Sequence, residues 1–229
     1  MKKNYLIIPS ILSANPICLK KEIKKIIETK TEMIHIDITD NHYVPNLTFG
    51  ISTCQSIKKH FPTIKLDIHL MAHPTRNLIY SMLKIKANRI TIHIDSSTHI
   101  NHIMNIIKKH CKIGIALNPT NSPLQIKKYF NNIDYVVIMS VNPGFPNQKF
   151  IPKIKNKIKW IKKNFPKLTI CIDGGINTHN ILSLAKHGAK QFVIGNTIFS
   201  KSNYNKIISN LYKKLNTLNL SYSIKNIVK

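Results

Sequence analysis

The segment MIHID at residues 33–37 is the most informative part of this 229-residue chain, and KLDIHL at residues 65–70 repeats its pattern. Successive side chains of an extended strand point to opposite faces, so His35 and Asp37 share one face. The same holds for Asp67 and His69. Each segment therefore predicts a strand that carries an imidazole and a carboxylate toward one side. In a single sheet, such groups from separate strands can converge.

Short apolar, β-branched runs of strand length recur along the sequence. They predict eight strands, at Tyr5–Pro9, Met33–Asp37, Lys65–Leu70, Arg89–Ile94, Lys112–Leu117, Tyr135–Met139, Leu168–Asp173 and Gln191–Ile194. Apolar residues at helical spacing lie between these runs. Helices are predicted over residues 151–165 and at Leu19–Lys30, Thr75–Lys86, His99–His110, Thr178–His187 and Tyr204–Leu215.

The alternation of strands and helices predicts a parallel sheet. Closure into a (β/α)8 barrel is favoured over an open sheet, because no GxGxxG motif follows the first strand. The length of 229 residues is close to the roughly 250 residues of such barrels. We therefore expect one barrel domain over residues 1–229. The sequence leaves open whether its basic end, residues 219–229, is ordered.

Composition limits the compartment and the class of protein. The four cysteines are far apart and form no CxxC pair, which argues against a disulfide framework or a zinc knuckle and favours reduced thiols in the cytoplasm. No run approaches the roughly 18 apolar residues that cross a bilayer, and no cleaved signal follows the start. The sequence therefore predicts a soluble cytoplasmic protein that does not bind a membrane.

The charge is strongly positive, with 35 Lys and Arg against 9 Asp and Glu. Such a surface can attract nucleic acid or phosphorylated metabolites. The lysines, however, are spread over every predicted helix without an aromatic-rich stripe, and arginine occurs only at Arg76 and Arg89. We interpret them as a solvated surface and expect no nucleic-acid partner.

In a (β/α)8 barrel the chemistry takes place at the carboxyl ends of the strands. Polar and small residues stand at these ends in five of the predicted strands, namely Ser10, Asp37, His69, Asp173 and Gly195. By contrast, Asp67 is predicted to lie one layer deeper with a structural hydrogen bond. His93 has no matched carboxylate on its strand and is predicted to be a core residue. The sequence thus predicts one polar site at one end of the barrel.

Several motifs extend this pattern: PSILSA at 9–14, DNHYVPN at 40–46, DIHLM at 67–71, MSVNPGF at 139–145 and IDGG at 172–175. HxD or DGG alone is weakly specific, whereas the segment 40–46 is highly specific. Together they resemble the ribulose-phosphate 3-epimerase family, over residues 5 to about 199. The resemblance implies a (β/α)8 metalloenzyme of the pentose phosphate pathway. It would interconvert D-ribulose 5-phosphate and D-xylulose 5-phosphate.

The resemblance also implies roles for the polar residues. Asp37 and Asp173 would be the two bases that exchange the proton on carbon 3, one on each face of the sugar. His35, Asp37, His69 and Asp173 would hold one divalent metal ion per subunit. Two nitrogen and two oxygen ligands suit zinc, iron, cobalt or manganese, and the sequence does not select one.

Substrate contacts follow from the same resemblance. Ser10 and His69 would bind the sugar, together with Asp173. The phosphate would be held by backbone amides of glycine-containing loops after the sixth, seventh and eighth strands, where a short helix adds its dipole. The residues of these loops are Gly144, Phe145, Pro146, Asn147, Gly174, Gly175, Gly195 and Asn196. The family also implies a homo-oligomer.

Three departures from the family pattern affect four positions. Pro146 and Asn147 replace two glycines, and proline offers no N–H, so we expect the loss of one phosphate contact or of some loop mobility. Thr39 replaces a common methionine and is expected to make one side of the reaction pocket more polar. Asn15 replaces a common aspartate and removes a charge near the first loop. The four metal-site residues are present, so we expect activity with a raised Michaelis constant.

Two alternatives remain open on the sequence. The same site could serve a 3-epimerase of another phosphorylated ketose, such as a ketohexose 6-phosphate. From a different class, the chain could be a basic barrel protein that associates with nucleic acid. That second alternative predicts binding that weakens steeply with salt and is indifferent to metal.

Overall fold

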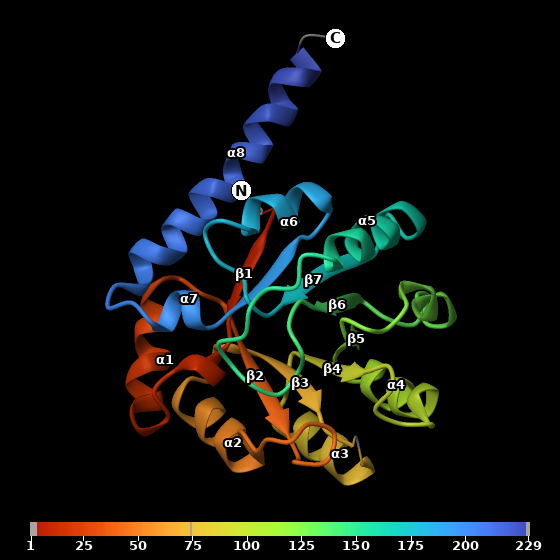
Figure 1. Cartoon of the computed structure of the whole chain (residues 1–229). Helices are drawn as coiled ribbons and strands as arrows, with labels where there is room; N and C mark the ends of the chain where they lie inside the picture. Colours follow the sequence, from red (N-terminus) through yellow and green to blue (C-terminus); the bar gives the residue numbers. More distant parts are fainter. Residues whose placement is uncertain (1–3, 74, 228–229) are drawn as a thin grey trace.

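The computed structural model describes residues 4–73 and 75–227, with side chains of the last helix described up to Leu218. Within these residues eight parallel strands form one sheet in the order β1-β8-β7-β6-β5-β4-β3-β2. A single parallel bridge between Ser10 and His35 joins the two outer strands, so that the sheet closes into a barrel (Figure 1). The predicted (β/α)8 fold is therefore confirmed.

The strands match the predicted runs to within two residues. They are β1 (Leu6–Pro9), β2 (Met33–Thr39), β3 (Lys65–Met71), β4 (Arg89–His93), β5 (Lys112–Leu117), β6 (Tyr135–Met139), β7 (Thr169–Asp173) and β8 (Gln191–Ile194). Their apolar side chains pack against the surrounding helices, as Ile34, Ile36 and Ile38 of β2 do. The alternate residues of β2 face the barrel interior, which brings His35 and Asp37 to the same side.

Helices surround the barrel in chain order. They are α1 (Leu19–Glu28), α2 (Ile51–His60), α3 (Arg76–Lys84), α4 (Ile100–Lys108), α5 (Ile154–Asn164), α6 (Ile181–His187), α7 (Asn196–Phe199) and α8 (Tyr204–Ile227). Three 3-10 helices, η1 (Ile11–Ser13), η2 (Pro16–Cys18) and η3 (Pro123–Lys128), lie in the first and fifth connections. Helix α2 was not singled out from the sequence. The helix predicted from Thr178 begins only at Ile181, because Asn177 forms an Asx turn with His179 and Asn180 first.

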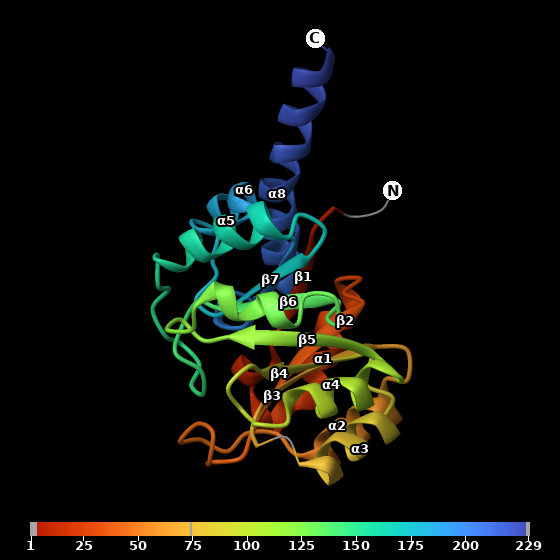
Figure 2. The same cartoon turned by 90° about the vertical axis from the view of Figure 1, so that its right-hand side faces the viewer.

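The last helix continues beyond its predicted end at Leu215. Helix α8 runs to Ile227, through most of the segment 219–229 whose order the sequence left open, and residues 228–229 lie outside the described part. Leu211, Leu215 and Leu218 are buried in the common core. In both views the C-terminal half of α8 projects away from the barrel (Figures 1 and 2).

The core has two parts. A large isoleucine-rich cluster fills the layer between the strands and the helices. A smaller cluster, which includes Ile8, Val137 and Val193, lies inside the barrel. Polar side chains occupy the rest of the interior, and they carry the candidate site. None of the helices in the described ranges has the length and apolar character needed to cross a bilayer.

Candidate metal centre and active site

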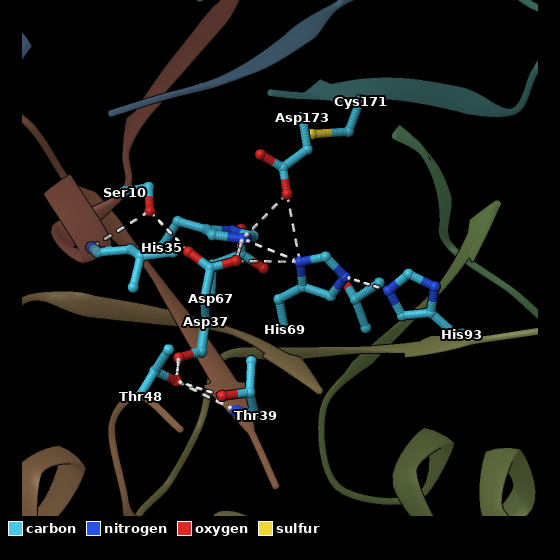
Figure 3. Close-up of polar contacts among 12 residues, drawn as sticks. Ser10, His35, Asp37, Thr39, Thr48, Asp67, His69, His93, Cys171 and Asp173 are labelled. Carbon is cyan, nitrogen blue, oxygen red and sulfur yellow. Dashed lines mark hydrogen bonds and ion pairs between the residues drawn. The ribbon is translucent and has the colours of Figure 1, made fainter. Parts of the chain in front are cut away.

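Three strands bring the predicted polar residues together at one end of the barrel (Figure 3). Strand β2 carries His35 and Asp37, and its parallel pairing with β3 sets Asp37 beside His69. Asp173 ends β7. In the closed barrel, β1 and β8 lie between β2 and β7, so Asp37 and Asp173 approach from different sides.

The four side chains form a compact cluster whose donor atoms lie within 4.8 Å of one another. Nε2 of His35 is 3.2 Å from Oδ1 of Asp37 and 3.5 Å from Oδ2 of Asp173. Nδ1 of His69 is 3.3 Å and 3.2 Å from the same two oxygens. The two ring nitrogens are 3.2 Å apart.

These distances are compatible with a bound metal ion. With bonds of about 2.0–2.2 Å, the ligand atoms around a tetrahedral ion are about 3.3–3.6 Å apart. The four histidine–carboxylate separations and the histidine–histidine separation, at 3.2–3.5 Å, are close to this spacing. The cluster also gathers two imidazole nitrogens and two carboxylate oxygens, all of which can offer lone pairs to a cation. These residues can therefore hold a divalent ion, whose identity the donor set does not select.

Electrostatics within the metal-free cluster support the same conclusion. Burial lowers the pKa of His35, but the negative charges of Asp37 and Asp67 outweigh it and raise the pKa well above its ordinary value. The pKa of His69 is likewise raised by its hydrogen bonds to Asp173 and Asp37, against the effect of burial. Burial alone would raise the pKa of Asp37. The charge of His35 has the opposite effect, and the pKa of Asp37 is lowered overall. The carboxylates thus attract a cation, which is a proton or a metal ion.

A second layer of side chains contacts the two histidines. Nδ1 of His35 is 2.7 Å from Oδ2 of Asp67, which also accepts a hydrogen bond from Arg89. Asp67 is 1 % exposed, as expected for a residue one layer deeper. His93 is fully buried, as predicted for a core residue, but its Nε2 is also 2.9 Å from Nε2 of His69. The planes of the two rings are 10° from parallel, with centroids 5.0 Å apart.

An open pocket lies above the cluster, at the carboxyl ends of the strands. Asp37 and Asp173 form part of its wall, whereas His35 and His69 are fully buried beneath. The pocket is also lined by all the predicted phosphate-loop residues, namely Gly144, Phe145, Pro146, Asn147, Gly174, Gly175, Gly195 and Asn196. Ser10 lies on the wall, and its hydroxyl donates to Oδ2 of Asp37 at 2.7 Å.

Comparison with known proteins gives a clear relationship. The model of the "Ribulose-phosphate 3 epimerase family" matches residues 6–199. The chain is 41 % identical over 217 residues to the ribulose-phosphate 3-epimerase of Buchnera aphidicola subsp. Acyrthosiphon pisum, covering 92 % of this chain and 95 % of the relative. It is 35 % identical over 219 residues to the Escherichia coli ribulose-phosphate 3-epimerase, covering 93 % and 97 %. The chain belongs to the ribulose-phosphate 3-epimerase family. This membership identifies it as a carbohydrate epimerase.

Solved structures of other enzymes share the fold of this epimerase. A 3-hexulose-6-phosphate synthase from Salmonella typhimurium has a TM-score of 0.70 at 12 % identity and covers 92 % of this chain and 98 % of its own. A thiamine phosphate pyrophosphorylase from Pyrococcus furiosus has a TM-score of 0.68 at 15 % identity, covering 94 % and 96 %. At such low identity the likeness concerns the barrel alone.

The loop after β6 contains Pro146 and Asn147, where the resemblance leads us to expect two glycines. Asn147 has a φ of 63°, so it retains the left-handed conformation that glycine adopts easily and that asparagine tolerates best among other residues. Gln148 braces the loop, because its Nε2 donates to the carbonyl oxygens of Asn142 and Phe145. The backbone path is thus compatible with Asn147, while Pro146 offers no N–H at the pocket wall.

The loop after β7 requires its glycines. Gly174 and Gly175 have φ values of 104° and 59°. A Cβ on Gly175 would lie 2.9 Å from the backbone nitrogen of Phe150, so the β6 and β7 loops touch backbone to backbone. This close approach shapes one wall of the pocket.

The expectation for Thr39 was wrong. The Thr39 hydroxyl donates to Oγ1 of Thr48 at 3.3 Å, and Thr39 is not among the described residues that line the pocket. Thr48 in turn donates to the backbone oxygen of Asp37 at 2.5 Å (Figure 3). The threonine thus turns its polar group toward a neighbouring loop rather than toward the cavity. Asn15 accepts the Ile17 N–H at 3.1 Å and caps η2.

The sequence did not predict a network of hydrogen bonds between the loops at the carboxyl ends of the strands. The Tyr43 hydroxyl donates to Oδ1 of Asp95 at 2.6 Å and accepts from Nδ2 of Asn118 at 2.8 Å. Nδ2 of Asn46 donates to the Gly144 oxygen at 2.7 Å. The loop after β2 is thereby tied to the ends of β4, β5 and β6. No local spacing indicates these pairs, since their partners are 52 to 98 residues apart.

Proposed function

We propose that this chain interconverts D-ribulose 5-phosphate and D-xylulose 5-phosphate by moving the proton on carbon 3 from one face of the sugar to the other. One observation carries the proposal. Asp37 and Asp173 come from separate strands, line one pocket and flank the same pair of histidine nitrogens. A proton removed from one face and returned to the other needs two such carboxylates.

Each carboxylate acts as base in one direction and as acid in the other. Asp37 is held in place by the Ser10 hydroxyl at 2.7 Å, which leaves Oδ1 turned toward the histidines. Asp173 ends β7 directly before two glycines, so little side-chain bulk stands between its carboxylate and the pocket. Removal of a proton by either aspartate leaves negative charge on the oxygens next to carbon 3.

We assign His35, Asp37, His69 and Asp173 as the ligands of one divalent ion. When bound, that ion supplies Lewis-acid stabilisation of the developing negative charge. Zinc, iron, cobalt and manganese all suit the donor set. Because His69 is fully buried beneath the pocket wall, we assign it to the metal rather than to direct substrate contact.

The phosphate group would lie against the three glycine-containing loops. Gly144, Gly174 and Gly175 have positive φ values and no side chain, so a ligand in the pocket can approach their backbone N–H groups closely. Asn196, the first residue of α7, lines the same wall. This arrangement favours a phosphorylated sugar over a neutral one.

The test is the conversion of ribulose 5-phosphate by protein treated with a chelator, before and after addition of each divalent metal. We expect no turnover by the stripped protein and recovery with at least one of the four metals. Turnover that is unaffected by chelation would contradict the metal assignment. Ketohexose 6-phosphate assayed beside ribulose 5-phosphate tests the rival substrate, and higher kcat/KM for the hexose would replace the present proposal.

We also propose that the enzyme forms a homo-oligomer in the cytoplasm. Ile17 and Leu47 are 93 % and 69 % exposed, so both apolar side chains are available for a contact with another subunit. The four cysteines are unpaired, as expected in a reducing compartment. Light scattering at micromolar concentration should give a multiple of the 26.3 kDa chain mass, and a monomer would contradict this proposal.

A further inference from the structure

A row of buried polar groups crosses the barrel beneath the metal cluster. Arg89 of β4 is 3 % exposed, and its Nη2 donates to Oδ2 of Asp67 at 2.6 Å. Its Nη1 donates to Oε1 of Gln191 on β8, and its guanidinium carbon lies 4.4 Å from the ring centroid of Tyr135. The same Oδ2 of Asp67 accepts from Nδ1 of His35 at 2.7 Å. One carboxylate oxygen therefore joins the arginine to a ligand histidine.

This contact determines which nitrogen of His35 is free to bind metal. A neutral imidazole has one N–H and one lone pair. If Nδ1 carries the hydrogen that is donated to Asp67, the lone pair is on Nε2. Nε2 is the atom that faces Asp37 and Asp173, at 3.2 Å and 3.5 Å. Asp67 thus selects the tautomer that presents a lone pair to the cluster.

Asp67 needs a cation to remain an acceptor in this place. A carboxylate that is 1 % exposed is costly unless it is paired. Lysine is the usual cation of this chain, and arginine occurs at only two positions. Here a planar guanidinium reaches Asp67 with one nitrogen and Gln191 with the other, a geometry that the single ammonium of lysine does not reproduce.

We propose that Asp67 and Arg89 are positioning residues of the metal centre, which hold His35 in the tautomer and orientation that bind a divalent ion. This inference rests on the proposed function. Neither residue lines the pocket among the described residues, so both act through His35 and not on the substrate.

Metal binding to the full-length chain tests the proposal directly. Asp67→Asn keeps the size of the side chain and one acceptor oxygen but removes its charge. Stripped protein would be titrated with Zn²⁺ against a chromophoric chelator, and with Co²⁺ to record its visible spectrum. We expect the Kd for Zn²⁺ to rise by about 10- to 100-fold and the Co²⁺ bands to shift. Asp134→Asn is the matched control, since this exposed carboxylate accepts the Ile113 N–H at the opposite end of the barrel.

Two arginine variants keep the proposal testable if Asp67→Asn does not fold. Arg89→Met should raise the Kd as Asp67→Asn does, and Arg89→Lys should raise it less, because lysine retains the charge without the fork. Circular dichroism and the melting temperature would be recorded for each. The proposal is overturned if the folded variants have a lower melting temperature but the Kd and Co²⁺ spectrum of the wild type.

Turnover is measured separately and distinguishes this inference from the proposed function. A wild-type protein that binds Zn²⁺ or Co²⁺ but does not convert ribulose 5-phosphate with any of the four metals would contradict the proposed function. In that case, the ratio of the Kd values of wild type and Asp67→Asn would still decide the positioning role. Normal turnover with equal Kd values in wild type and variants would contradict only the positioning role.

Discussion

At the scale of single residues, most of the site's chemistry depends on a few atoms of Asp37 and Asp173. Both carboxylates contact the same two imidazole nitrogens at 3.2–3.5 Å, and both line the pocket. In the proposed mechanism they therefore combine two roles, as metal ligand and as proton carrier. This double role makes each of them irreplaceable by its amide, which has the same shape but neither the charge nor the basicity.

Asp173→Asn is expected to lower kcat by about 10²- to 10⁴-fold or more, since it removes one of the two bases. A coupled assay with ribulose 5-phosphate measures the loss, and circular dichroism should show an intact fold. Asp134→Asn, far from the pocket, should retain full activity. Wild-type turnover by Asp173→Asn would rule out its role as a base.

At the scale of elements, the loops at the carboxyl ends of the strands form the wall of the pocket. The loop after β6 has Pro146 and Asn147 on the pocket wall and is braced by Gln148. The proline removes one N–H that a phosphate oxygen could accept. The hydrogen bonds of Gln148 and the proline ring also restrict the backbone of this loop. Substitutions here should therefore alter the affinity for the sugar phosphate more than the proton transfer at the aspartates.

The double variant Pro146→Gly and Asn147→Gly restores the family's glycines. One additional hydrogen bond of about 0.5–1.5 kcal/mol corresponds to a KM for the sugar phosphate lower by about 2- to 10-fold, with kcat little changed. Steady-state kinetics measure both constants. Pro152→Gly, in an exposed turn away from the pocket, is the control. A KM equal to that of the wild type would disprove the importance of the proline.

Helix α8 illustrates how an element is fixed by packing. Leu215 is fully buried in the layer between the barrel and the helices. Leu215→Ala should lower the free energy of unfolding by about 2–5 kcal/mol, because it leaves a cavity. Its neighbour Asn216 is exposed, and Asn216→Ala should change stability by no more than about 0.5 kcal/mol. Denaturant unfolding monitored by circular dichroism compares the two variants, and equal stabilities would contradict the packing of α8 at Leu215.

At the scale of the whole molecule, the metal cluster links stability to pH. In the metal-free protein the pKa values of His35 and His69 are raised by the surrounding carboxylates, despite burial. A raised pKa in the folded state stabilises the protein below the unfolded pKa, and this contribution is lost as the pH rises through the folded pKa. Metal ions, in contrast, bind the deprotonated imidazoles.

We therefore expect the two histidines to lower the melting temperature of stripped protein as the pH is raised from about 6 to about 9. The increase in melting temperature produced by Zn²⁺ should grow over the same range. Thermal unfolding with chelator and with Zn²⁺ measures both trends. An increase that is the same at every pH would show that protons and metal do not compete for this cluster.

Much of this protein follows from local sequence. Short apolar, β-branched runs predicted all eight strands, and two-residue alternation assigned their faces, because the faces of a strand are a property of the extended backbone itself. The same rule placed His35 with Asp37, and the rule that chemistry lies at the carboxyl ends of barrel strands singled out Asp173. Helix α2 escaped prediction, because its sequence ISTCQSIKKH has few apolar residues at helical spacing.

Other features depended on tertiary structure. The contacts of Asp173 with His35 and His69 join strands far apart in the chain and require the closed barrel. The contact of His69 with His93 and the row from His35 through Asp67 to Arg89 require the register of the paired strands β2, β3 and β4. The direction of the Thr39 hydroxyl also depends on tertiary structure, because Thr48, its hydrogen-bond partner, lies in a loop that folds back onto β2. Local periodicity determines the face on which a side chain lies. Distances and partners arise only when closure brings separate strands into register.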